Sequence, residues 1–189
     1  MTDPASRAKP IAGDLAMNML RPPDLPTLYR SELAYVWKTL RRLGAPPSDL
    51  EDLAHDVFVV VHRHLHDYDP ARPLRPWLFG IALRVVSDYR RLGRHRHEVS
   101  GERVEPVAAG PTPDEQVEGM EARALLLEAL DTLDLDRRAV FVMHEIDDVP
   151  VPEIASVLSI PLNTAYSRLR LARADLAAWL GRAAERRQR

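Results

Sequence analysis

The pattern that most constrains the fold lies near the C-terminus, where two stretches of helical periodicity are separated by a three-residue break. Residues 152–158 predict a short helix, and residues 162–180 predict a longer, basic helix. The break between them, Ser159-Ile160-Pro161, leaves room only for a tight turn. A short helix, a tight turn and a longer basic helix are typical of a helix-turn-helix.

The second helix of such a motif enters the major groove of DNA, with its first residues against base edges and with flanking cations on phosphates. Asparagine can pair with adenine and arginine with guanine, so these residue types can read sequence. The residues available for this role are Asn163, Thr164, Tyr166, Ser167, Arg168, Arg170 and Arg173. The alternative is a packing helix with a solvated basic face, and the spacing favours DNA binding.

Helical periodicity also covers residues 27–43, about 48–65, 77–92, 121–133 and 136–147. The second of these stretches begins with Ser48-Asp49-Leu50-Glu51, which has the form of a capping box, and Pro76 suits the first turn of the third. The apolar face of the second helix is wider than one core face requires, which favours a partner surface. No strand pattern competes, so the sequence predicts an all-α fold.

Proline-rich segments divide the chain into two small helical domains joined by a flexible linker. We expect a disordered leader over residues 1–26, a first domain over 27–97, an acidic linker over 98–119, a second domain over 120–182 and a basic tail over 183–189. The composition of the linker is equally consistent with a plain disordered tether and with a functional segment.

Charge is unevenly distributed although the formal net charge is only -2. Residues 84–97 and 163–189 are basic, whereas residues 98–118 are acidic, so two basic poles flank an acidic middle. The chain has no cysteine, which excludes disulfides, thiolate zinc sites and direct thiol redox sensing. Neither a signal peptide nor a spanning segment is recognisable, so we expect a cytoplasmic protein without membrane insertion.

The C-terminal motif resembles region 4 of the sigma-70 family, and the N-terminal half independently resembles region 2. The region 4 likeness rests on Glu153-Ile154-Ala155, Leu158-Ser159-Ile160-Pro161, Asn163-Thr164-Ala165-Tyr166-Ser167-Arg168-Leu169 and Arg138-Ala139-Val140-Phe141. The region 2 likeness rests on Asp52-Leu53-Ala54-His55-Asp56-Val57-Phe58, Trp77-Leu78-Phe79-Gly80-Ile81-Ala82 and Asp88-Tyr89-Arg90-Arg91. The likeness spans roughly residues 28–180 and is closest to the compact extracytoplasmic-function (ECF) group.

The resemblance implies a sigma factor that binds core RNA polymerase, directs it to promoters, and has no catalytic residue or cofactor of its own. Region 4 would recognise the minus-thirty-five element, through the helix-turn-helix residues named above. Region 2 would bind the clamp helices of the polymerase, and its contact residues would be Asp49, Asp52, Asp56, Val57, Phe58 and Val61. The polymerase flap, double-stranded and melted promoter DNA, and an anti-sigma factor are the other implied partners.

Region 2 in this family also melts the minus-ten element, by capturing a flipped base in the loop before the third helix. The corresponding loop, residues 67–75, offers Tyr68 for stacking and arginines for phosphate. The full implied set is Tyr68, Arg72, Arg75, Arg84, Ser87, Asp88, Arg90, Arg91 and Arg94. Trp77, at the start of an amphipathic helix, fits a core position better than a DNA contact.

Several positions depart from the family pattern. Leu83-Arg84 stands where Arg-Asn is usual, Tyr166 replaces a usual Lys, and Ser159 and Asn163 replace glycines. Because of these changes, the resemblance does not predict which promoter sequence is recognised. Two other classes remain: a stand-alone helix-turn-helix regulator, and a metal-dependent hydrolase built on His62, His64 and His66, although solvated histidines explain that cluster better.

Overall fold

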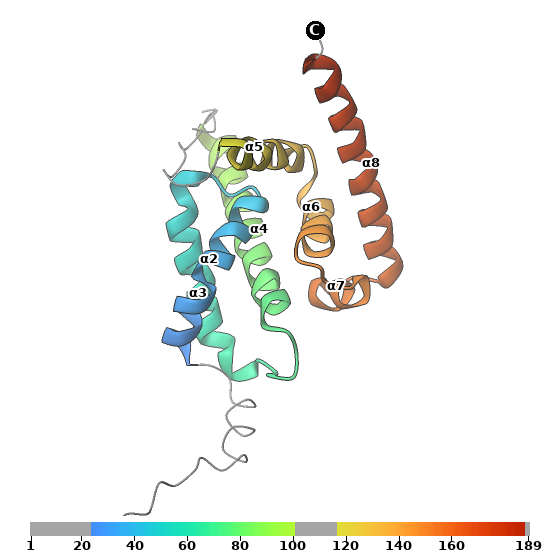
Figure 1. Ribbon diagram of the computed structural model, residues 1–189. Helices are drawn as coiled ribbons and strands as arrows, with labels where there is room; N and C mark the ends of the chain where they lie inside the picture. The colour runs from blue at the N-terminus through green and yellow to red at the C-terminus, as the bar shows by residue number, and fades with distance from the viewer. Residues whose placement is uncertain (1–23, 101–116, 188–189) are drawn as a thin grey trace, which may run out of the picture.

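The computed structural model describes residues 24–100 and 117–187, and every regular element in these two stretches is a helix (Figure 1). The prediction of an all-α fold is therefore confirmed. The first 23 residues and most of the predicted acidic linker lie outside the described residues.

The N-terminal half contains three long helices: α2 (Leu25–Arg42), α3 (Leu50–His64) and α4 (Leu74–Ser100). Helix α2 begins two residues earlier than predicted. Pro26 suits its first turn, because a backbone N–H at this position would have no hydrogen-bond partner within the helix. Helix α4 extends well past the predicted end at Leu92. A short 3₁₀ turn, η2 (Leu65–Asp67), follows α3 and leads into the loop before α4.

The predicted capping box at Ser48 is wrong. A 3₁₀ turn, η1 (Pro47–Asp49), precedes α3, and the Ser48 hydroxyl donates to the Asp49 carboxylate at 2.7 Å instead of accepting from the helix backbone. Asp49 accepts a further hydrogen bond from the Tyr89 hydroxyl of α4. These two hydrogen bonds lower the pKa of Asp49, and they tie the start of α3 to α4.

The C-terminal half contains α5 (Val117–Asp131), α6 (Leu135–Phe141), α7 (Val151–Leu158) and α8 (Leu162–Arg187). A single helix was expected over residues 136–147. Its hydrogen-bond pattern changes from α to π at Val142, where a π-helical turn, η3 (Val142–Ile146), begins. Residues 183–187, predicted as a tail, continue α8.

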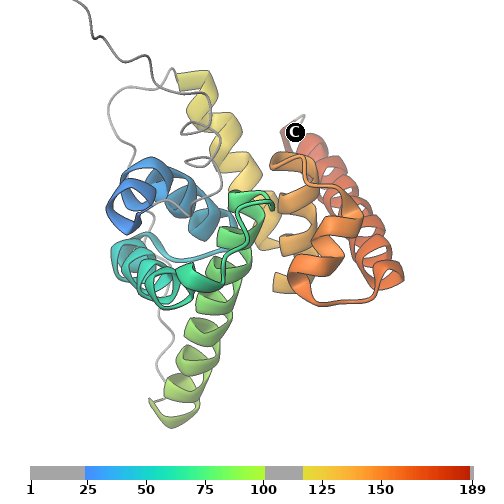
Figure 2. The same ribbon diagram turned by 90° about the horizontal axis from the view of Figure 1, so that it is seen from below.

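The two halves pack against each other around α4, which lies between the α2–α3 pair and the C-terminal helices (Figures 1 and 2). Helix α5 contacts α2 on one side and α8 on the other, and α4 contacts α7. At Gly80 of α4 a Cβ atom would lie 3.1 Å from Val157 Cγ1 of α7. The absence of a side chain at residue 80 therefore permits the contact.

No helix in the described stretches is both long and apolar enough to cross a membrane. Within the same residues, no group of three histidine, aspartate or glutamate side chains is arranged to hold a metal ion. His62, His64 and His66 are exposed, and His64 and His66 each lie beside the Asp67 carboxylate, at 3.3 and 3.1 Å.

Candidate promoter and polymerase interface

Helix α8 has one face in the core and one in solvent. Ala165, Leu169 and Ala172 are buried at helical spacing, and they fasten the helix to α6 and α7. The opposite face carries the exposed side chains of Asn163, Tyr166, Ser167, Arg170 and Arg173, whereas Thr164 and Arg168 are half-buried at its edge. Tyr166 is 52% exposed, so its ring is available to a partner.

The turn that sets the angle of α8 is made by Ser159, which has a φ of 54° and caps the end of α7. The Ile160 amide donates to the Ala155 carbonyl at 3.0 Å, so the last turn of α7 is closed by backbone hydrogen bonds. The left-handed conformation is the reason that glycine is usual at such a position.

Ion pairs hold α8 to the preceding elements. The Arg168 guanidinium pairs with Asp136, Arg173 Nε donates to Glu145 at 2.8 Å, and Arg137 Nη1 donates to Asp175 at 2.7 Å. Two of the arginines expected to contact DNA are therefore oriented by carboxylates of the α6–η3 segment. Arg170 of α8 is exposed.

The loop before α4 is organised around Tyr68 and Trp77. Their ring centroids lie 5.0 Å apart, and the Tyr68 hydroxyl donates to the Arg72 carbonyl at 2.6 Å. Burial, followed by the charge of Asp69, raises the pKa of Tyr68. Trp77 is half-buried and packs on the core, as its position in the helix predicted. Arg72 remains exposed at the rim of the loop.

The residues expected to contact the minus-ten element divide into an exposed and an internal group. Arg84, Ser87, Asp88 and Arg91 are exposed along α4, and Arg91 pairs with Asp88 at 3.1 Å. Arg94 lies beyond the part of α4 whose side chains the structure describes.

Arg90 and Arg75 have internal partners. Arg90 Nη2 donates to the Leu43 carbonyl at 2.7 Å, at the end of α2, so this side chain supports the fold. Arg75 pairs with Glu32 at 3.1 Å and lies over the Tyr35 ring at 5.1 Å, although its side chain remains largely exposed. The assignment of DNA contacts to these two arginines stays a prediction.

The residues expected to bind polymerase divide in the same way. Asp52 and Asp56 are exposed on α3, next to Glu51 and His55, which the sequence reasoning had left out. Val57, Phe58 and Val61 are buried in the core of this chain. The wide apolar face of α3 is needed because the helix packs against both α2 and α4, and Tyr29 of α2 covers Phe58 with ring centroids 4.6 Å apart.

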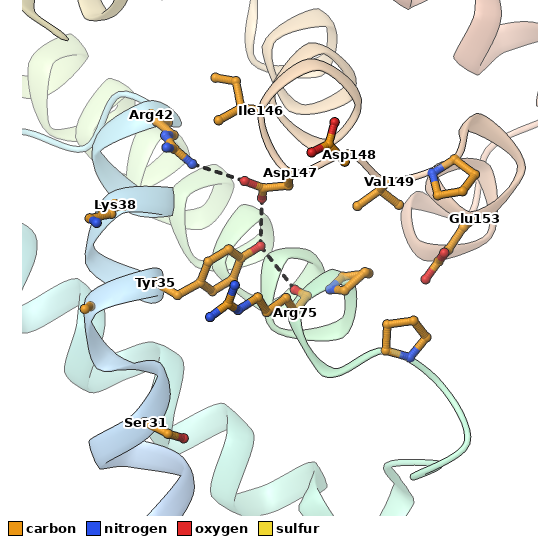
Figure 3. A pocket seen from close by; sticks show the side chains of 14 residues that line it. Ser31, Tyr35, Lys38, Arg42, Arg75, Ile146, Asp147, Asp148, Val149 and Glu153 are labelled. Atoms are coloured by element: carbon orange, nitrogen blue, oxygen red, sulfur yellow. Dashed lines mark hydrogen bonds and ion pairs between the residues drawn. The ribbon is translucent and has the colours of Figure 1, made fainter.

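A polar cluster that leaves no signal in the sequence pattern joins the two halves. Asp147, directly after η3, accepts hydrogen bonds from the Tyr35 hydroxyl at 2.8 Å and from Arg42 Nη1 at 3.1 Å (Figure 3). The cluster borders a cavity of about 690 Å³ between α2 and the segment that precedes α7. Periodicity could not reveal it, because the three residues belong to distant parts of the chain.

Comparison with known proteins assigns the family. Residues 28–96 match sigma-70 region 2, and residues 123–176 match sigma-70 region 4. The RNA polymerase sigma factor NccH of Alcaligenes xylosoxydans xylosoxydans is 33% identical over 144 residues, which cover 74% of this chain and 77% of NccH. The ECF RNA polymerase sigma factor SigL of Mycobacterium tuberculosis is 31% identical over 146 residues, 77% of this chain and 82% of SigL.

A solved structure shares the fold: RpoE of Bartonella quintana, in a co-crystal with the anti-sigma factor NepR, aligns with a TM-score of 0.69 at 21% identity, covering 84% of this chain and 97% of RpoE. The matches to region 2 and region 4, in this order along the chain, define a transcription initiation factor. The chain belongs to the sigma-70 family of RNA polymerase sigma factors, and ECF factors are among its relatives. The region 2 match accounts for the N-terminal half of the chain, which the alternatives of a stand-alone regulator and a metal-dependent hydrolase leave unexplained.

Proposed function

We propose that this sigma factor recognises the minus-thirty-five promoter element with the exposed face of α8. The observation that carries the proposal is the division of α8, in which Ala165, Leu169 and Ala172 anchor one side while Asn163 and Arg170 face solvent on the other. A helix held this firmly by its apolar side can enter a major groove about 12 Å wide without rearrangement. Tyr166 presents an apolar ring with a hydroxyl to the same groove, where a lysine would bind phosphate.

Region 2 is proposed to melt the minus-ten element with the loop over residues 67–75 and the exposed side of α4. Arg72 and Arg84 supply positive charge beside the half-buried Trp77. A base leaving the duplex would displace Tyr68 or stack against the Tyr68–Trp77 pair. Since the capture of a base requires an unpaired strand, the binding energy would be spent on strand opening.

The exposed acidic side chains of α3, Asp52 and Asp56, are proposed to contact the clamp helices of core RNA polymerase, joined by Glu51 at the start of the helix. The buried Val57, Phe58 and Val61 hold α3 in place from behind. An anti-sigma factor is the remaining proposed partner, supported by the RpoE structure, in which a chain of the same fold is bound to one.

Run-off transcription tests the proposal as a whole. Purified core polymerase with this chain should produce transcripts from a subset of a randomised promoter library, and core polymerase alone should not. A chain that binds DNA but neither binds core nor starts transcripts would support the alternative of a free DNA-binding protein and would overturn the proposal.

Arg168 provides a sharper test of the minus-thirty-five assignment. We expect Arg168→Ala to weaken binding to a selected minus-thirty-five sequence about tenfold and to leave core binding unchanged, as for the loss of one base contact. Asp136→Ala is the matched control, because it breaks the same ion pair and keeps the cation. Equal loss of DNA binding in both variants would assign Arg168 to the fold.

A further inference from the structure

Two apolar side chains are exposed in the first turns of α8. Leu162, the first residue of the helix, is 43% exposed, and Tyr166 is 52% exposed. Because they are four residues apart, they lie next to each other on one side of the helix. Single exposed apolar residues are ordinary on a protein surface, so the surroundings of this pair decide whether it has a role.

The neighbours of the pair are polar side chains without internal partners. Asn163 and Arg170 are exposed, and they lie three residues before and four residues after Tyr166, on the same side of α8. Within the described residues, the side chains of Asn163, Tyr166 and Arg170 form no hydrogen bond or ion pair. We call Leu162, Asn163, Tyr166 and Arg170 the open face of α8.

The open face lies away from the contact between the two halves. Arg168 lines a cavity together with Ser87 of α4, so this edge of α8 is the one beside region 2. Tyr166 is two residues from Arg168, or about 200° around a helix with 3.6 residues per turn, and therefore lies on nearly the opposite side. Helix α8 as a whole is on the far side of the C-terminal half from α2 and α3 (Figures 1 and 2).

The chemistry of the open face matches one kind of base pair. The edges of the bases present a single methyl group in the major groove, the 5-methyl of thymine, and the other groups there are polar. Leu162 and Tyr166 offer apolar surface to such a methyl group, and Asn163 between them is suited to the adenine of an A·T pair. Arg170 is suited to a guanine further along the groove.

The length of the open face also fits this reading. Leu162 and Arg170 are eight residues apart, which is about 12 Å along the helix axis at about 1.5 Å per residue. Base pairs follow each other at about 3.4 Å, so this length corresponds to three or four of them. A helix-turn-helix places the first residues of this helix against base edges, so Leu162 and Tyr166 stand where base edges are contacted.

We propose that Leu162 and Tyr166 are specificity-determining residues that contact thymine methyl groups, so that the minus-thirty-five element of this sigma factor contains thymine at one or two positions under the start of α8. The inference rests on the proposed function. A cation at residue 166 would bind a phosphate, which carries no sequence information. The apolar ring of Tyr166 instead distinguishes thymine from bases that lack the methyl group.

Replacing thymine by deoxyuridine tests the methyl contact directly, because deoxyuridine lacks only the methyl group and keeps the groups that pair with adenine. Holoenzyme assembled from core polymerase and this chain is used to enrich duplexes with a randomised minus-thirty-five element. Each thymine of an enriched element is then replaced in turn. We expect the replacement to weaken binding about fourfold at one or two positions, as for the loss of one buried methyl group, and to have no effect elsewhere.

Substitutions on α8 assign the contact to its side chains. Tyr166→Ala and Leu162→Ala should each bind thymine and deoxyuridine equally at the position that they read, whereas Tyr166→Phe keeps the ring and should keep the fourfold difference. Tyr166→Lys should lose the difference and steepen the salt dependence of binding by about 0.9 in a log–log plot, for one added phosphate contact. Leu180→Ala removes another exposed apolar side chain of α8, beyond its first turns, and is the matched control that should behave as the unmodified chain.

The proposal is overturned if deoxyuridine is tolerated at every thymine of the enriched elements, or if its effect is the same in the unmodified chain and in both alanine variants. A Tyr166→Phe variant that binds as weakly as Tyr166→Ala would assign the contact to the hydroxyl and a phosphate, and would also overturn it. So would a Tyr166→Ala variant that loses core binding and keeps the deoxyuridine effect, since the pair would then contact protein. If no minus-thirty-five sequence is enriched at all, the proposed function fails and this inference fails with it.

Discussion

At the scale of a single residue, Ser159 adopts an unfavourable backbone conformation within the helix-turn-helix. Its left-handed backbone disfavours any residue with a Cβ, and its neighbours require that conformation because the Ile160 amide closes the end of α7. The angle between α7 and α8 is thus held by the surrounding hydrogen bonds against a local preference.

We therefore expect Ser159→Gly to raise the free energy of unfolding by about 0.5–1 kcal/mol, because glycine adopts this conformation without strain. Urea unfolding followed by circular dichroism measures the change. Ser156→Gly, within α7, is the matched control and should lower the stability by about 0.5 kcal/mol. A destabilising Ser159→Gly would show that the serine hydroxyl contributes more than the backbone costs.

Asp49 makes the free energy of unfolding depend on pH. The hydrogen bonds from Ser48 and Tyr89 lower its pKa in the folded state below the ordinary value of 3.8. Its contribution is therefore complete above about pH 4 and is lost as the pH falls through the lowered pKa. The difference in urea midpoint between the unmodified chain and Asp49→Asn should be constant from about pH 7 to 5 and should shrink near pH 3. A difference that stayed unchanged at low pH would contradict the assignment.

At the scale of elements, α3 has two different faces. Its apolar face packs between α2 and α4, which leaves Asp52 and Asp56 exposed on the acidic face. Helix α8 is divided in the same way, with ion pairs to α6 and η3 along its edge. In both helices, burial on one side fixes the positions of the exposed side chains on the other.

The double variant Asp52→Ala/Asp56→Ala should weaken binding to core polymerase about fivefold to tenfold, with a smaller effect at high salt because exposed charges are screened. Native gel titration with core polymerase measures this. Glu121→Ala/Glu128→Ala removes two exposed carboxylates from α5 and should have little effect. If both double variants weaken binding equally, net charge and not the α3 face is responsible.

At the scale of the whole molecule, the contact between the halves depends on close approaches that small residues permit. At Gly44, which has a φ of 84°, a Cβ would collide with the guanidinium groups of both Arg138 and Arg90. Because Arg138 belongs to region 4 and Arg90 to region 2, this glycine controls how closely the end of α2 meets both halves.

Gly44→Ala should therefore lower the free energy of unfolding by about 2 kcal/mol or more and increase the radius of gyration, measured by small-angle X-ray scattering. Gly181→Ala is the matched control, because a Cβ there meets nothing within 4 Å on α8. It should stabilise the helix slightly and leave the size unchanged. A Gly44→Ala chain of unchanged size and stability would show that the arginines can move aside without separating the halves.

The sequence by itself determined the helical class, the helix-turn-helix and the family. Apolar spacing and motif residues are local properties, so they can be recognised without knowing which segments pack against each other. The capping box at Ser48 failed, since a 3₁₀ turn redirected the hydroxyl to Asp49. Only the tertiary structure decided that Val57, Phe58 and Arg90 face inward and that Asp147 joins α2. The physical reason is that burial and pairing depend on neighbours supplied by distant segments, which leave no periodic signal in either partner.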